Sequence, residues 1–120
     1  MITMTELQGI HECAVRRAVI TGRAKLIVTH GDKLQFLDFN SSAASYPLTQ
    51  IHARVEPMHA LITYLLDDTR TFKTREDAYH HAQHVFDNLH EDVVIWRTPA
   101  DRFIVIHQSL DASVYGCELL

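Results

Sequence analysis

Three histidines on one predicted helix are the residues of this chain best suited to chemistry. His80, His81 and His84 lie in the segment TREDAYHHAQHVFDNLHE, in a chain that has nine histidines among 120 residues. Imidazole titrates near neutral pH and is the commonest metal ligand in proteins. This helix is therefore the first place to look for a metal site or for acid–base chemistry.

The spacing of the histidines favours a pair on one helix face. At about 100° per residue, His80 and His84 project from the same face, opposite the apolar stripe, with Asp77 and Asp87 beside them. These four side chains could bind a divalent metal such as zinc or nickel, and would then serve a metal-dependent enzyme or binder. The alternative, an exposed polar face, is favoured because the face has no evident walls. A metalloprotease is excluded, since His81 occupies the position of the HExxH glutamate.

A thiol, an imidazole and a carboxylate also occur near the end of the chain, as Cys117, His107 and Asp111. A thiol nucleophile needs a neighbouring base and an orienting acid, but nothing in the sequence brings these three together. A buried, inert Cys117 is the ordinary interpretation. Cys13 and Cys117 are too few for a disulfide framework, and no signal peptide or long apolar run is present, so we expect a cytoplasmic protein with reduced thiols.

The charge balance argues against nucleic acid as a partner. The formal net charge is −4, and no broad basic surface is expected. Arg16, Arg17 and Arg23 lie close together in the sequence, so Arg16 and Arg17 could contact a phosphate or an acidic partner. Two arginines on a polar helix face are more often simply solvated. Glycine-rich phosphate loops and the common catalytic motifs are missing from the sequence.

The first half of the chain reads as a helix followed by a hairpin. We predict a helix from Thr5 to about Thr21, capped by Thr5 and ended by Gly22, although residues 14–21 could also begin a strand. Gly31-Asp32 then separates two apolar runs, which is a hairpin signal. The second of these strands is apolar on both faces and is expected to be central in its sheet. A short strand, IHARV, follows a neutral loop, NSSAASYPLTQ.

The second half repeats this order after an intervening helix. That helix begins at Pro57, and its predicted buried stripe leaves Tyr64 outside. The histidine helix starts at Thr74, and a second hairpin, DVVIWR-TPAD-RFIVIH, follows it, with a possible last strand in SVYGCELL. The residues expected on the two buried stripes are Met58, Leu61, Ile62, Leu65 and Leu66 in the first helix, and Ala78, Ala82, Val85, Phe86 and Leu89 in the second.

These elements predict one α+β domain over residues 1–120. The expected architecture is an antiparallel or mixed sheet of about five strands, including two hairpins, packed with about three helices. A helix followed by a hairpin occurs twice, at 5–38 and 74–107, as a topological echo without matching residues.

The absence of a reaction motif favours a protein that binds another protein without catalysis. We expect an inhibitor, immunity protein or adaptor of the kind found among small accessory proteins of bacteria and phages. A homodimer through a strand edge is a further possibility. The expected contact surface comprises the sheet edges, the neutral loop at 40–50 and the aromatic side chains, with the alternative that these aromatics cover the core. The residues expected at this interface are Tyr46, Pro47, Tyr64, Tyr79 and Trp96.

Overall fold

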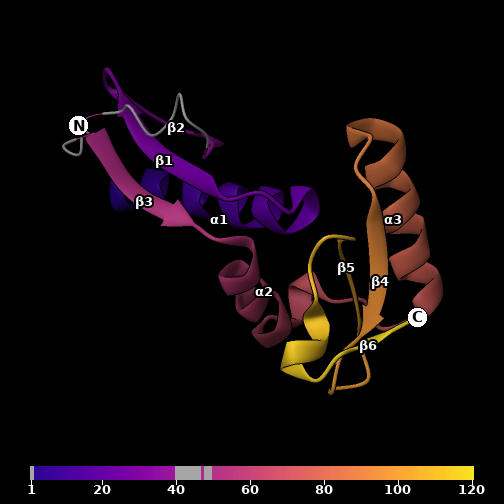
Figure 1. The fold of residues 1–120 in the computed structure, drawn as a ribbon. Helices are drawn as coiled ribbons and strands as arrows, with labels where there is room; N and C mark the ends of the chain where they lie inside the picture. The colour runs from indigo at the N-terminus through magenta and orange to yellow at the C-terminus, as the bar shows by residue number, and fades with distance from the viewer. Residues whose placement is uncertain (1, 40–46, 48–49) are drawn as a thin grey trace.

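A computed structural model describes residues 2–39, 47 and 50–120, and its first part is a helix followed by three strands. The helix α1 (Met4–Thr21) precedes the strands β1 (Lys25–His30), β2 (Lys33–Asp38) and β3 (Ile51–Val55). Figure 1 shows α1 lying beneath this small sheet. We call these four elements the first unit.

The second unit also has one α-helix and three strands. It contains the helix α3 (Arg75–Leu89), the hairpin strands β4 (Val93–Arg97) and β5 (Phe103–His107), and the two-residue strand β6 (Glu118–Leu119), with the 3₁₀ helix η4 (Ala112–Tyr115) before β6. In Figure 1, α3 runs alongside β4 and β5, with which it packs. The helix and hairpin expected at both ends of the chain are thus present.

The sheet topology differs from the expected single sheet. The strands form two three-stranded antiparallel sheets, with the orders β2-β1-β3 and β5-β4-β6. In each unit the first strand is central, the second pairs with it as a hairpin, and the third returns to its other side. The prediction that β2 is central was wrong, because β1 is the strand that buries side chains on both faces.

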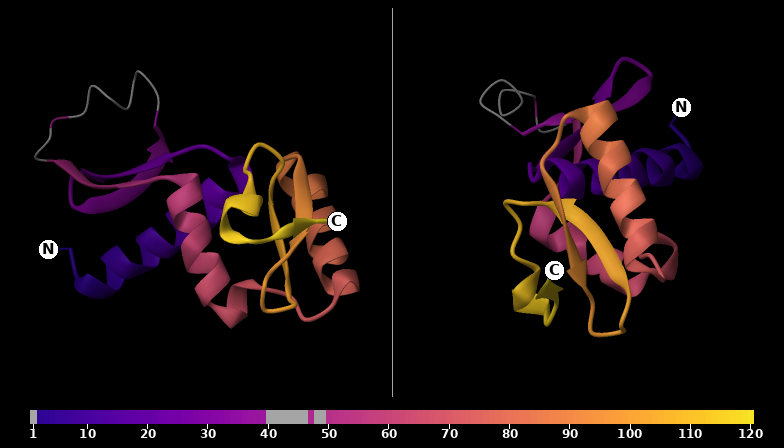
Figure 2. Two further views of the ribbon diagram at one scale, coloured as in Figure 1. Left: turned by 60° about the horizontal axis from the view of Figure 1, so that its bottom comes forward. Right: turned by 90° about the vertical axis from the view of Figure 1, so that its right-hand side faces the viewer.

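The helix α2 (Pro57–Leu66) and the 3₁₀ helix η3 (Asp68–Arg70) connect the two units. The principal-axis extents are 43 × 28 × 28 Å, and Figure 2 shows the two units arranged along the long direction. One apolar cluster nevertheless includes side chains of both units, because α1 packs against β5 as well as against its own sheet. Its most buried large members are Val19, Ile27, Leu61, Ile104 and Ile106.

The ends of the helices follow the expected signals with one shift. Thr3, rather than Thr5, caps α1 by accepting a hydrogen bond from the Glu6 N–H at 3.1 Å. Residues 14–21 are helical, and Gly22 ends α1 in the left-handed conformation with φ 68°. Thr74 caps α3 as expected, by accepting from the Asp77 N–H at 3.1 Å.

The predicted buried stripe of α2 is confirmed for Leu61, and Met58 and Leu65 pack at the edge of the core, but the centre of the stripe is displaced by about one residue. The helix buries Pro57, Ala60, Leu61 and Tyr64, whereas Ile62 and Leu66 are exposed. A shift of one residue corresponds to a rotation of about 100° around the helix axis. Because α2 is apolar on nearly all sides, its own periodicity could not orient it, and packing against α1 and η4 decided the rotation.

Candidate functional site

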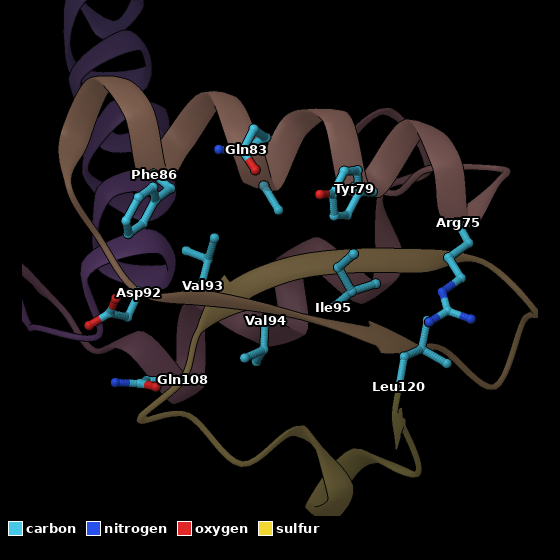
Figure 3. Close-up of a pocket in the computed structure, with 11 residues that line it drawn as sticks. Arg75, Tyr79, Gln83, Phe86, Asp92, Val93, Val94, Ile95, Gln108 and Leu120 are labelled. Carbon is cyan, nitrogen blue, oxygen red and sulfur yellow. The ribbon is translucent and has the colours of Figure 1, made fainter.

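A groove lies between α3 and β4, and both polar and apolar side chains line it. It has a volume of about 430 Å³, within the range of sites that bind ligands. Figure 3 shows α3 along one side of the groove and β4 along the other. We call it the α3–β4 groove, and its lining residues are Arg75, Tyr79, Ala82, Gln83, Phe86, Asp92, Val93, Val94, Ile95, Gln108 and Leu120.

One stripe of α3 forms the helical wall. Tyr79, Ala82, Gln83 and Phe86 follow the spacing i, i+3, i+4 and i+7, which places them on one face. Tyr79 is 59% exposed and Phe86 is 50% exposed. The prediction that Phe86 belongs to the buried stripe was wrong, because its side of α3 faces the open groove.

The strand wall has an unpaired edge. Strand β6 pairs only with Trp96 and Arg97 of β4, and the Leu120 N–H adds one bond to the Ile95 carbonyl at 3.2 Å. Along a strand, alternate residues point their backbone N–H and C=O groups to the same edge. The backbone N–H and C=O of Val93 therefore point to the same edge of β4 as those of Ile95, the edge on which β6 lies. No described strand pairs with Val93 on that edge.

Polar and apolar groups are separated along the groove. In Figure 3, Val93 and Ile95 point toward α3, Arg75 lies near Leu120 at one end, and Asp92 lies at the opposite end. Between these ends, Tyr79, Gln83 and Phe86 line the groove without a charged side chain. This arrangement suits an extended peptide that supplies backbone hydrogen bonds and an apolar side chain.

The five residues expected at an interface are placed in different environments. Tyr79 lines the α3–β4 groove, Pro47 is exposed, and Tyr46 lies outside the described residues. Tyr64 and Trp96 are each only 7% exposed and belong to the core. Tyr64 and Trp96 therefore cover the core, which was the alternative prediction for the aromatic residues, and they are not part of the contact surface.

The four candidate metal ligands lie on the exposed face of α3. His80 Nε2 lies 3.9 Å from Glu76 Oε1, His84 contacts the Asn88 amide at 3.1 Å, and Asp87 accepts from the Gln83 amide at 3.1 Å. Asp77 is also exposed, and no described element covers the face. Among the residues that the structure describes, no group of three or more His, Cys, Asp or Glu side chains is arranged to hold a metal ion.

The thiol, imidazole and carboxylate of the second unit are engaged locally. His107 Nδ1 bonds to Ser109 at 2.8 Å, and Asp111 caps η4 by accepting from the Ser113 N–H at 3.0 Å. Burial raises the pKa of the Cys117 thiol, which keeps it protonated. This arrangement does not produce an activated thiol nucleophile.

Most residues of the groove carry no sequence signal that predicts a binding site. The helical spacing predicts Phe86 in the core, and the pattern around Val93, Ile95 and Leu120 predicts only strands. A usable signal was present, since the stripe from Tyr79 to Phe86 combines two aromatic residues with the polar residue Gln83. The unpaired edge of β4 depends on the length of β6 and had no sequence signal.

Comparisons with protein-family models, with curated proteins and with solved structures found no match for this chain. Within the described ranges, every helix is too short or too polar to cross a membrane.

Proposed function

We propose that the protein is a non-enzymatic binding module that masks or bridges a protein partner, as inhibitors, immunity proteins and adaptors do. Its site of action would be the cytoplasm, as the two free cysteines suggest. The observation that carries the proposal is the unpaired edge of β4 beside the exposed rings of Tyr79 and Phe86. Exposed aromatic side chains next to free backbone groups are typical of surfaces that add a strand from another chain.

The partner on this proposal presents an extended segment. Its backbone would pair with Val93, and one apolar side chain would lie between Tyr79 and Phe86. An acidic residue at one end of the segment would face Arg75, and a basic residue at the other end would face Asp92. These charges would set the direction of the bound segment.

A library of displayed extended peptides tests the proposal. We expect selected peptides to bind the wild-type protein and to bind Phe86→Ser about tenfold more weakly or worse, since aromatic residues dominate most interfaces. Leu66→Ser is the matched control, because Leu66 is an equally apolar, exposed helix residue outside the groove. It should leave peptide affinity unchanged.

Hydrogen exchange provides a second measurement. Binding should slow exchange of the Val93 N–H, because a paired strand protects that group from water. Peptides that bind Phe86→Ser and wild type equally would contradict the proposal. A concentration-dependent dimer that Phe86→Ser dissociates would show instead that the β4 edge pairs with a second copy of this chain.

A further inference from the structure

A second, smaller pocket lies where the two units meet, away from the α3–β4 groove. Its volume is about 290 Å³, and α1, α2, η3, α3 and β5 all contribute to its walls. Two arginines line it, although the chain as a whole is acidic. The polar and aromatic side chains around it are Arg16, Tyr64, Thr69, Arg70, Phe72 and His81.

Arg70 has hydrogen-bonding capacity that the protein does not use. Its Nε lies 3.3 Å from Asp67 Oδ2, and its guanidinium carbon lies 5.4 Å from the centre of the Tyr64 ring. Its Nη1 is enclosed and has no hydrogen-bond partner among the described residues. Because an enclosed guanidinium nitrogen is costly to leave unpaired, this geometry points to an acceptor oxygen supplied from outside the chain.

Arg16 adds a second positive charge to the same place. It makes no ion pair with any residue that the structure describes, so its guanidinium group is available. Burial raises the pKa of Tyr64 to about 12, and the charges of Arg70 and Arg16 oppose that rise, so both lie within electrostatic reach of the phenol oxygen. Asp67 neutralises one of the two cations, which leaves the pocket with a net charge near +1 at neutral pH.

The remaining walls combine aromatic rings with Thr69 and Val105. The Phe72 and His81 rings lie 5.1 Å apart with an interplanar angle of 35°, and Val105 lies on the β5 side. Burial, with a smaller contribution from His84, lowers the pKa of His81, so this imidazole is neutral at neutral pH. The walls therefore match a planar or apolar body attached to an anionic group.

We propose that this pocket binds a small organic anion, with Arg16 and Arg70 holding its oxyanion and the rings of Tyr64, Phe72 and His81 contacting its body. A phosphate monoester and a carboxylate share this chemistry, since a guanidinium group pairs with either. The site is separate from the α3–β4 groove and is independent of peptide binding there.

Calorimetric titration with phenyl phosphate and with benzoate tests the proposal and distinguishes the two anions. We expect saturable binding of at least one probe, with a Kd below about 1 mM. Arg16→Gln should weaken it about tenfold or more, as expected for a lost charge-assisted hydrogen bond. Arg17→Gln is the matched control, because Arg17 is the next residue on the same helix, is exposed and does not line the pocket.

Three results would overturn the proposal: no saturable binding of either probe, equal weakening by Arg16→Gln and Arg17→Gln, or binding of inorganic phosphate as tight as that of both aromatic probes. The second would show unspecific attraction to α1, and the third would show that the ring walls contribute nothing. Phe86→Ser should not change the anion affinity, so failure of this proposal and failure of the peptide-binding proposal are distinguishable.

Discussion

The two units have one topology but cover their helices to different extents. The second half of α1 is buried against its own sheet, α2 and β5, through Ala14, Val15, Ala18 and Val19. The main packing partners of α3 are β4 and β5, and of its residues only Ala78 and Val85 are buried. The same arrangement of elements therefore gives a structural helix in the first unit and a helix with an open apolar side in the second. What decides the difference is the presence of a neighbouring element.

The largest expected effect concerns the core that the units share. Ile27→Ala in the first sheet and Ile106→Ala in the second should each lower the free energy of unfolding by about 3 kcal/mol, because both side chains are fully buried in one cluster. Urea unfolding followed by tryptophan fluorescence and by circular dichroism should show one transition in both variants. Two transitions in the same variant, of which the substitution shifts only one, would mean that the units unfold independently.

The ends of the two helices give the next largest effect. Gly22 and His90 both end their helix in the left-handed conformation, with φ 68° and 53°. Gly22→Ala should cost about 2 kcal/mol or more, because an added Cβ would also overlap Ser109 Oγ and lie 2.8 Å from His107 Nδ1. His90→Gly should instead stabilise the protein by about 0.5–1 kcal/mol, because glycine adopts this conformation without strain. Thermal unfolding checks both signs.

Gly31→Ala separates the cost of backbone strain at Gly22 from the cost of the close contact with Ser109. Gly31 has φ 64°, but an added Cβ would contact nothing within 4 Å. Its substitution should therefore cost only the backbone strain of about 1 kcal/mol. An equal loss of stability in Gly22→Ala and Gly31→Ala would contradict the close approach of α1 to the β5–η4 connection.

One titratable group in each unit should make the stability of the whole protein depend on pH, each in its own pH range. His81 in the second unit has a folded-state pKa below its unfolded value, chiefly because of burial, so the unfolded chain binds more protons as the pH falls through about 6.5. Stability should decline from there toward lower pH. Asp38 in the first unit has a lowered pKa, mainly through its hydrogen bond with Lys25, so its contribution is present above about pH 4 and is lost below.

Two variants distinguish the pH range in which His81 affects stability from the range in which Asp38 does. Urea midpoints measured from pH 8 to pH 3 should lose the slope below neutral pH in His81→Gln and the slope at acidic pH in Asp38→Asn. If His81→Gln kept the full slope between pH 7 and 5, the burial of this imidazole would not be its cause.

The smallest expected effect is on the open side of α3. Phe86→Ser should change the free energy of unfolding by no more than about 0.5 kcal/mol, because the ring is half exposed and packs against a narrow wall. Val85→Ala, at the adjacent buried position, should cost about 1–2 kcal/mol. A large loss in Phe86→Ser would show that the ring is a core residue, as its apolar spacing first indicated.

The elements themselves could be predicted because their signals are local. The Thr74 cap, Gly22 and the Gly31-Asp32 turn act on neighbouring backbone, so the helices and hairpins lie close to where the sequence indicated them. The exposed positions of His80 and His84 also followed from one helix period. The sequence could not show whether His107, Asp111 and Cys117 contact one another, because the partners of these residues depend on loop geometry.

By itself, the sequence determined the order of helices and strands, the polar face of α3 and the absence of a familiar catalytic motif. Only the tertiary structure decided that the strands form two sheets, that Tyr64 and Trp96 are buried, and that Phe86 is exposed. It alone brought Arg16 and Arg70 to one pocket. The physical reason is that caps, turns and periodicity act between near neighbours in the chain, whereas burial and charge convergence depend on which distant element lies alongside.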